Sequence, residues 1–264
     1  MSQPHATRSA IFWLSTRPAR FGLGVAGLLV LLGVWALLTQ QLQTTTPLAA
    51  MMSPGESLAA LYRMVTGGEL TFDTLASLKR VLVSLVLAIA IGVPIGVMVG
   101  LSQTVDASTS YSFQFLRMIS PLSWMPIAVM AFGIGDAPIY FLLTITAIWP
   151  IILNTAAGVR ALDPNWLMLA KSLGANRRET LFRFIAPGIL SHVLTGSRVA
   201  IGMIWILLIP CEMLGVTSGL GYFILDTRDR LAYSELMAII LVIGALGLVL
   251  DASAQGLRKL FVNE

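Results

Sequence analysis

Between residues 163 and 189 the chain reads DPNWLMLAKSLGANRRETLFRFIAPGI, a charged and helix-forming sequence with long apolar runs on both sides. Its basic side chains include Lys171, Arg177, Arg178 and Arg183. Charges at this density belong in water, and a basic loop between two membrane spans faces the cytoplasm. We therefore expect a membrane protein in which this stretch is a cytoplasmic loop.

The composition of the chain fits a protein that lies in a lipid bilayer. Of its 264 residues, 56% are hydrophobic and 11% are charged, and the mean hydropathy is +0.84. Soluble domains carry about 25% charged residues. The apolar runs are continuous, whereas membrane barrels show short alternating strands. We predict an all-α, polytopic membrane helix bundle. Its basic residues flank the apolar runs instead of forming one face, so no nucleic-acid partner is expected.

A membrane-spanning helix needs about 20 apolar residues, and about six transmembrane helices are expected. The candidates are Phe21–Leu38, Val81–Leu101, Phe113–Phe132, Ile139–Gly158, Ile189–Pro210 and Leu236–Ala254. The first is too long for the apolar part of a signal peptide, about 7–15 residues, and is expected to be retained. The third holds Arg117 near its start and Pro121 and Pro126 inside.

The distribution of positive charge predicts the orientation. With the N-terminus in the cytoplasm, twelve of the 17 Lys and Arg residues, Arg117 among them, fall on the inner side, so both termini are expected there. The expected order is a cytoplasmic segment (1–20), the first span (21–38), an external linker (39–78), a core (79–256) and a cytoplasmic end (257–264). The linker is expected to begin irregularly and to carry surface helices at Leu58–Val65 and Phe72–Leu78.

The cytoplasmic loop, residues 160–188, carries an apolar stripe. Leu162, Trp166, Leu169 and Leu173 are spaced by four, three and four residues, which predicts one helix face. Gly174 suits the left-handed end of that helix. The stripe either packs on the protein's own bundle or docks a partner, and the residues favour neither.

A second helix is expected to follow directly. Asn176 is a good N-cap, and Glu179 stands in the capping-box position. Pro187 is then expected to break the chain before the fifth span.

Nothing in the chain indicates an enzyme. It has no G-x-x-x-x-G-K-[ST] phosphate loop, so ATP would have to bind another subunit. Its two histidines, His5 and His192, and its one cysteine, Cys211, cannot form a catalytic or metal cluster. We expect no catalytic residue, no metal and no cofactor on this chain.

Small and charged residues inside the spans predict helix contacts. Two small-xxx-small units, formed by Gly92, Gly96 and Gly100, predict close helix packing. Charged residues in membrane spans are rare. Arg198 and Asp251 fall at similar depth near the inner ends of spans five and six, and we expect them to pair. Arg80 and Glu212 fall near the outer surface, where they could brace an external gate.

Several polar side chains could line a translocation path or equally hydrogen-bond their own helices. They include Ser120, Ser123, Thr146 and Asn154.

The loop resembles the EAA loop of binding-protein-dependent ABC transporter permeases. Gly174, Ile185 and Pro187 match the family pattern, whereas Met168 and Leu169 replace the family's Glu and first Ala. The resemblance implies an ATPase-coupling surface within residues 160–188. Its expected members are Leu162, Trp166, Leu169, Ala170, Lys171, Leu173, Gly174, Ala175, Arg177, Arg178 and Pro187.

The resemblance extends over about residues 78–260. Motifs such as PLSWMP at 121–126 and GLGY at 219–222 are similar to the nitrate/sulfonate/taurine/bicarbonate permease group. This implies a type I ABC importer permease fold in the bacterial cytoplasmic membrane and a small anionic cargo. The implied partners are a second permease copy, ATPase subunits that bind ATP and Mg, an external solute-binding protein and the lipid bilayer.

Two alternatives remain at this point. A permease of the same family could carry a neutral or aromatic molecule. An ion-coupled secondary transporter is disfavoured, because the middle of the spans holds almost no carboxylates.

Overall fold

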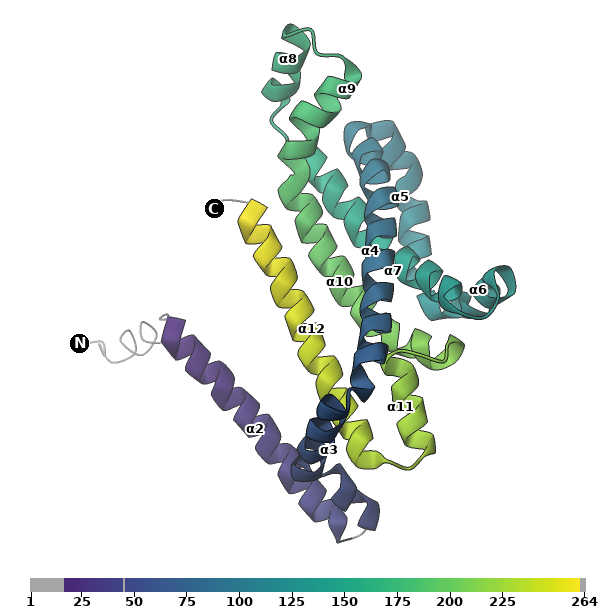
Figure 1. Ribbon diagram of the computed structural model, residues 1–264. Coiled ribbons are helices and arrows are strands. Elements are labelled where there is room, and N and C mark those ends of the chain that lie inside the picture. The colour runs from purple at the N-terminus through teal and green to yellow at the C-terminus, as the bar shows by residue number, and fades with distance from the viewer. Residues whose placement is uncertain (1–16, 45, 262–264) are drawn as a thin grey trace, which may run out of the picture.

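The computed structural model describes residues 17–44 and 46–261, which form helices joined by short turns and contain no strand (Figure 1). The long helices are α2 (Arg17–Gln43), α4 (Glu69–Leu101), α7 (Asp136–Arg160), α10 (Ala186–Gly215) and α12 (Tyr233–Phe261). The shorter elements are η1 (Pro47–Met52), α3 (Pro54–Gly67), α5 (Gln103–Met118), η2 (Pro121–Trp124), α6 (Met125–Phe132), α8 (Pro164–Ser172), α9 (Arg177–Glu179), η3 (Thr180–Ile185) and α11 (Leu220–Asp229). Five helices are long and apolar enough to span a membrane, and the bent α5–α6 pair makes a sixth, which confirms the expected fold class.

The core lies where α4, α7 and α10 pack together. Ile139, Leu143 and Ile151 of α7 have no exposed surface, and Ala88 of α4 and Ile204 of α10 join them. More than half of the α7 span is buried, a larger share than in any other span. α7 is therefore the central helix of the bundle.

The glycines of α4 bring it close to α7. A Cβ atom added at Gly96 would lie 2.6 Å from Thr155 Cβ, and one added at Gly100 would lie 2.6 Å from Val159 Cβ. Gly92 meets Ile151 in the same way, so both helices contact at every fourth residue. The structure brings these glycines to a helix–helix contact, as their small-xxx-small spacing predicts.

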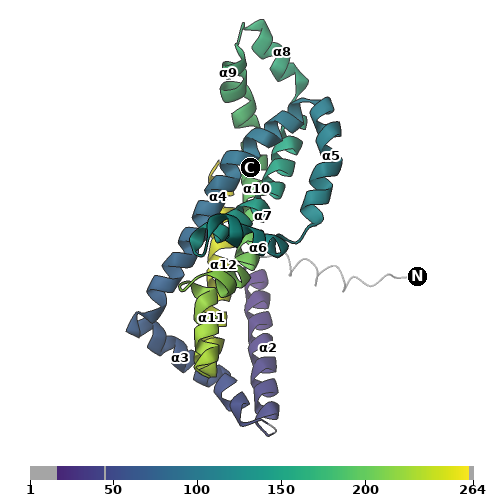
Figure 2. The same ribbon diagram turned by 90° about the vertical axis from the view of Figure 1, so that its right-hand side faces the viewer.

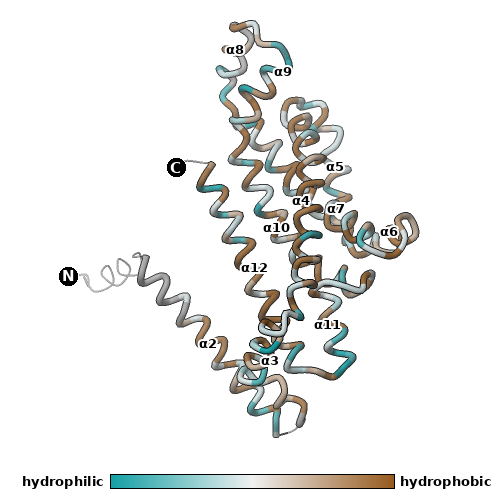
Figure 3. Tube along the Cα trace, in the orientation of Figure 1, coloured by the Kyte–Doolittle hydropathy of each residue, from teal (hydrophilic) through white to brown (hydrophobic). Residues whose placement is uncertain are grey.

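The two ends of the bundle differ. Figure 1 shows α8 and α9 projecting at one end and α3 and α11 gathered at the other. Figure 3 shows hydrophilic residues in the α8–α9 hairpin and at the far end of α11, with mostly hydrophobic stretches along the long helices between them. Apolar helices with polar ends are what a membrane-spanning bundle requires.

The first span stands apart from the core. None of the membrane-spanning window of α2 is buried, and α2 diverges from the bundle in Figure 1, whereas in the view of Figure 2 it runs in nearly the same direction as α11. Its attachment is at the α3 end, where the Trp35 Nε1–H donates to the Met52 carbonyl at 3.1 Å. A fully apolar helix without a packed face needs lipid or another chain around it.

The external segment is more helical than the sequence indicated. α2 runs to Gln43, and Leu58–Val65 lies within α3 as expected. The prediction of a separate surface helix at Phe72–Leu78 is wrong, because these residues form the first turns of α4. Gly68 ends α3 with a φ of +74°, and the chain re-enters a helix directly at Glu69.

The third expected span, Phe113–Phe132, is not one straight helix. α5 and the η2–α6 segment meet at an angle of 86°. Ser120 precedes Pro121, and the proline disfavours a helical conformation at the residue before it. Arg117, expected on the inner side, lies in the last turn of α5 beside Trp149, near the middle of α7.

Candidate functional site

The α8–α9 turn is built by its glycine. Gly174 has a φ of +71°, and the Ala175 N–H donates to the Ala170 carbonyl at 3.0 Å. This bond and a left-handed residue together form a Schellman C-cap, which satisfies carbonyls at the end of α8. The structure thus provides the helix, glycine break and second helix that the sequence indicated.

The second helix begins with the expected capping box. The Asn176 N–H donates to Glu179 Oε2 at 2.9 Å, and the Glu179 N–H donates to Asn176 Oδ1 at 2.9 Å. Two otherwise unpaired N–H groups are satisfied without any other element, so the turn keeps its shape although it projects from the bundle.

The projecting hairpin exposes apolar side chains. Trp166, Leu169 and Leu173 are 53%, 54% and 69% exposed. Met168 and Phe182, which were not among the expected members of the coupling surface, are also exposed. We call these five residues the docking face. Exposed apolar groups on a projecting, charged hairpin make this face a candidate surface for a partner.

The other expected members of this surface divide between its rim and its interior. Arg177 and Arg178 are exposed and border the docking face, Ala175 is half-buried, and the side chain of Lys171 lies outside those the structure describes. Ala170 is fully buried and faces inward.

The expectation that Leu162 shares the apolar stripe is wrong. It is half-buried, packs against the cluster around Val159 and Ile189, and lies over Gly188. It precedes α8, so the helical spacing does not reach it.

Pro187 does not break the chain, contrary to expectation. The helical path runs without interruption from Arg177 to Gly215. Before the proline, the π-helical turn η3 widens the helix, and the Ala186 N–H donates to the Leu181 carbonyl. A wider turn makes room for the proline ring, which would clash with the preceding turn of a regular helix. The proline itself is exposed.

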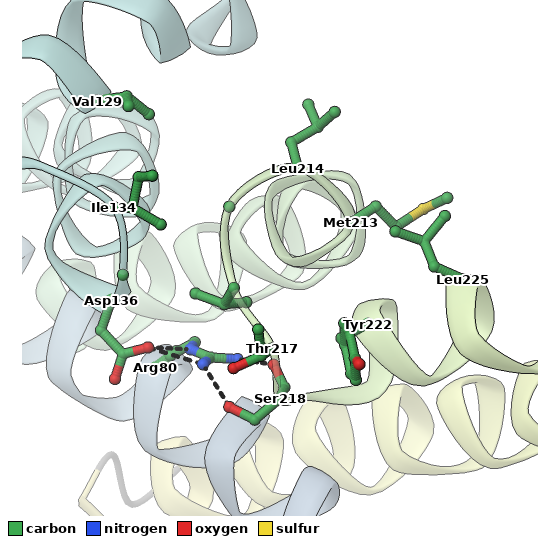
Figure 4. A pocket seen from close by; sticks show the side chains of 13 residues that line it. Arg80, Val129, Ile134, Asp136, Met213, Leu214, Thr217, Ser218, Tyr222 and Leu225 are labelled. Atoms are coloured by element: carbon green, nitrogen blue, oxygen red, sulfur yellow. Dashed lines mark hydrogen bonds and ion pairs between the residues drawn. The ribbon is translucent and has the colours of Figure 1, made fainter.

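At the opposite end, Arg80 and Glu212 form a buried ion pair. Arg80 Nη1 lies 2.6 Å from Glu212 Oε1, and the two side chains are 2% and 0% exposed. Ser77 Oγ donates to Glu212 at 2.7 Å, and Asp136 and Ser218 contact Arg80. These five residues are the outer charge cluster, which joins α4, α7, α10 and the α10–α11 loop. Figure 4 shows three of them, Arg80, Asp136 and Ser218.

Every N–H group of Arg80 is used within this cluster. Nε and Nη2 donate to Asp136 Oδ1 at 3.0 and 2.7 Å, and Nη2 also donates to Ser218 Oγ at 3.1 Å. Nη1 donates to Glu212 and to the Ser218 carbonyl at 2.8 Å. One arginine faces two carboxylates, so the formal charge is −1. The cluster therefore braces helices and leaves no donor for an anion.

The same cluster holds the start of α11. The Gly221 N–H donates to Glu212 Oε2 at 2.9 Å, the Leu220 N–H to Ser77 Oγ at 2.9 Å, and the Gly219 N–H to Asp73 Oδ1 at 2.7 Å. Gly219 has a φ of +109°, and a Cβ there would collide with Arg80 and Glu212. Residues 219 and 221 are therefore glycines because the backbone at the start of α11 lies too close to α4 and α10 for a side chain.

A pocket of about 780 Å³ opens beside this cluster. Arg80, Asp136 and Ser218 form its polar wall, and Ile134 and Tyr222 lie farther around it (Figure 4). It lies at the end of the bundle away from the docking face.

Sequence reasoning missed three members of the cluster. Ser77 and Ser218 carry no signal of their own, because hydroxyl groups are common in membrane helices. Asp136 did carry a signal in the sequence, because a carboxylate at the first position of a span, directly after Gly133-Ile134-Gly135, is unusual.

The inner charges meet as expected. Arg198 Nε and Nη2 donate to the Asp251 carboxylate at 2.8 and 3.1 Å, and Gln255 Nε2 adds a bond at 2.7 Å. The pair joins α10 to α12 and is partly exposed.

The polar residues considered for a translocation path do not converge. Thr146 Oγ1 donates to the Leu142 carbonyl at 2.7 Å, and Asn154 Nδ2 donates to the Pro150 carbonyl at 2.8 Å. Both bond their own helix, which is the alternative that the sequence left open. Ser120 and Ser123 are exposed at the α5–α6 bend.

Comparisons with known proteins agree with this architecture. Residues 92–263 match the family described as "Binding-protein-dependent transport system inner membrane component". The bicarbonate transport system permease protein CmpB of Synechococcus elongatus is 35% identical over 90% of this chain and 88% of its own length. The nitrate import permease protein NrtB of Leptolyngbya laminosa is 32% identical (84% and 81%), and the taurine transport system permease protein TauC of Escherichia coli K12 is 30% identical (97% and 93%).

A solved structure supports the fold. The MetNI methionine ABC transporter, in an inward-facing conformation, contains a chain that aligns with a TM-score of 0.61 at 14% identity, over 71% of this chain and 93% of that one. With its span-forming helices and its matched sequence, this chain belongs to the family of binding-protein-dependent transport system inner membrane components, the permease subunits of ABC importers.

Proposed function

We propose that this chain is the membrane subunit of an ATP-driven importer in which a separate ATPase docks on the α8–α9 hairpin. The exposed docking face is the observation that carries the proposal. Apolar side chains that are more than half exposed stand on a turn held by its own caps, with Arg177 and Arg178 beside them. The chain has no phosphate loop, so a partner must supply ATP binding, Mg and hydrolysis.

The coupling follows from the connection between the hairpin and the bundle. η3 continues from α9 directly into α10, which reaches the outer charge cluster through Glu212. A rigid helix of this length transmits a displacement at the docking face to the far end of the span. We infer that movement of the ATPase tilts α10 and opens or closes the outer end.

The proposed cargo is a small anion of the nitrate, bicarbonate or sulfonate class. The support comes from the relatives, whose names specify bicarbonate, nitrate and taurine transport. An external binding protein would deliver the cargo near α3 and the α10–α11 loop, and the pocket opens beside that loop. A second copy of this chain would complete the path, since none of the membrane-spanning window of α2 and only 11% of that of α12 is buried. Both chain termini would lie in the cytoplasm.

Purification of the tagged chain from its native membrane in mild detergent tests this proposal. The expected result is co-purification of an ATP-hydrolysing subunit and, after reconstitution with the binding protein, ATP-dependent uptake of labelled nitrate, bicarbonate or taurine. Recovery of the chain alone, in a detergent that preserves other ABC transporters, would contradict the assembly. Uptake of a neutral molecule in place of all three anions would contradict the cargo class.

A further inference from the structure

Arg117 is an exposed cation that lies beside the middle of α7. Among the described residues it makes no hydrogen bond or ion pair, whereas Arg80, Arg160 and Arg198 are all paired. It shares two cavities with Trp149, the fourteenth residue of the 25-residue helix α7. An arginine at this depth is costly in lipid, so it must face water, a ligand or another chain.

The larger of the two cavities leads from Arg117 toward the docking-face end. It holds about 140 Å³ between α5 and α7, and Arg160 and Asp106 lie at its other end, paired at 2.9 Å. Arg160 lies eleven residues beyond Trp149, about 16 Å along the helix. The volume equals roughly four or five water molecules at about 30 Å³ each, enough for a small oxyanion with part of its hydration.

The wall of this cavity on α5 is mostly polar, with Phe113 as its one apolar member among the described residues. Asp106, Ser110, Gln114 and Arg117 are spaced by four, four and three residues and line the cavity together. No residue of α5 is buried: Ser110, Gln114 and Arg117 are exposed although they line the cavity, and apolar side chains outside the cavity, such as Phe115 at 69%, are exposed as well. α5 is therefore amphipathic and turns its polar stripe toward α7, as expected of a helix that lines an aqueous path.

The charges at Arg117 contrast with those at the outer charge cluster. The cavity has a formal charge of +1, because Arg117 and Arg160 face Asp106 alone, and none of the five N–H groups of Arg117 meets an acceptor in the part of the chain that the structure describes. The outer charge cluster has a formal charge of −1, and its arginine has no donor left. Arg117, and not Arg80, has the donors to hold an anion.

We propose that Arg117 forms an anion-binding site for the cargo in the middle of the membrane, from which the polar stripe of α5 leads toward Arg160. Gln114 and Ser110 offer further donors along this route. A planar guanidinium suits the oxygens of nitrate, bicarbonate or a sulfonate group. The inference rests on the proposed small-anion cargo.

Uptake of labelled nitrate by the reconstituted importer is the first test. Arg117→Gln should lower the uptake by about tenfold or more, the loss expected for a charge-assisted hydrogen bond, and Arg117→Lys should restore part of it. Lys259→Gln, which removes one exposed charge near the C-terminus, is the matched control and should transport normally. ATP hydrolysis stimulated by the binding protein should persist in Arg117→Gln. Wild-type uptake in Arg117→Gln, or dissociation of the assembled complex, would overturn the proposal.

A second test does not depend on the cargo. The fluorescence of Trp149, obtained by difference from the Trp149→Phe variant, should be quenched by iodide, and Arg117→Gln should lower that quenching about threefold or more by removing the local positive charge. Quenching by neutral acrylamide should not change. Iodide quenching that is equal in both proteins would refute the anion site. If the wild-type importer carries no anion, the proposed cargo class is wrong, and the iodide result still decides whether the cavity attracts anions.

Discussion

Glu212 has no exposed surface, and its carboxylate is held by Arg80, Ser77 and the Gly221 N–H. Removing one member of a buried ion pair leaves the other unpaired, which costs about 3–5 kcal/mol. Glu212→Ala should therefore lower the thermal midpoint of the detergent-purified protein sharply. Asp136→Asn, at a side chain that is 40% exposed, should cost much less. Equal losses in the two variants would show that burial does not set the strength of this cluster.

The Arg198–Asp251 pair predicts a different result, because both side chains are partly exposed. Arg198→Asp and Asp251→Arg should each reduce stability modestly through like-charge contacts between α10 and α12. The double variant restores opposite charges and should recover most of the loss, as measured by thermal unfolding of all four proteins. Strictly additive losses would mean that the two charges are not coupled.

At the residue scale, charge and depth were informative and hydroxyl groups were not. Two charges on different spans at similar depth predict a contact, and the structure shows that contact for Arg198 with Asp251. The same argument placed Arg80 and Glu212 at the outer end but did not identify Asp136. Arg117 was misplaced because counting charges by side assumes that basic residues lie outside the bilayer.

Among the elements, the contact between α4 and α7 gives a sharp prediction. Gly96→Ala would place a methyl group 2.6 Å from Thr155 Cβ and 2.8 Å from the Ile152 carbonyl, so the helices must separate. Overpacking of this kind costs about 1–3 kcal/mol. Gly202→Ala, in α10 with no atom within 4 Å of the added methyl, is the matched control and should be neutral. The midpoints of thermal unfolding compare them, and equal midpoints would contradict the packing argument.

The α8–α9 turn can be tested through one backbone angle. Gly174 has a φ of +71°, whereas proline fixes φ near −65° and asparagine tolerates the left-handed region. Gly174→Pro should abolish ATP-dependent uptake with normal membrane insertion, and Gly174→Asn should retain most of it. The added side chain meets open space, so any loss comes from the backbone. Normal uptake in a correctly inserted Gly174→Pro protein would refute the role of the turn.

Helices were predictable where apolar periodicity and caps coincide, as in the hairpin from Trp166 to Glu179. Helices were not predictable where an apolar stretch can form either one straight span or two helices with a bend. Residues 113–132 are apolar enough for one span, yet Pro121 directs a bend of 86° that hydropathy does not register. At Pro187 the opposite error occurred. The sequence predicts that this proline breaks the helix, but the helix continues because the preceding π turn makes room for the proline ring.

For the molecule as a whole, the two ends differ in the surfaces they present. The α8–α9 end exposes an apolar docking face on a rigid turn, and the opposite end holds a saturated charge cluster beside a pocket of about 780 Å³. α10 connects them, and α2 contributes no buried surface to its own core. Composition and charge distribution predict this polarity in outline. The sequence does not show which apolar residues remain uncovered by the chain's own packing. These exposed faces, which the proposed partners would cover, can be identified only from the three-dimensional structure.

The most direct test of the central claim compares the two ends with one substitution each. Leu173 of the docking face and Leu75 near the outer end of α4 are equally exposed, at 69%. Leu173→Asp should abolish co-purification of the ATPase subunit, because a carboxylate would be buried at the interface, and Leu75→Asp should leave it intact. Quantitative mass spectrometry of the tagged chain from native membranes measures both. Full recovery of the ATPase with Leu173→Asp, or equal losses in both variants, would contradict docking on this hairpin.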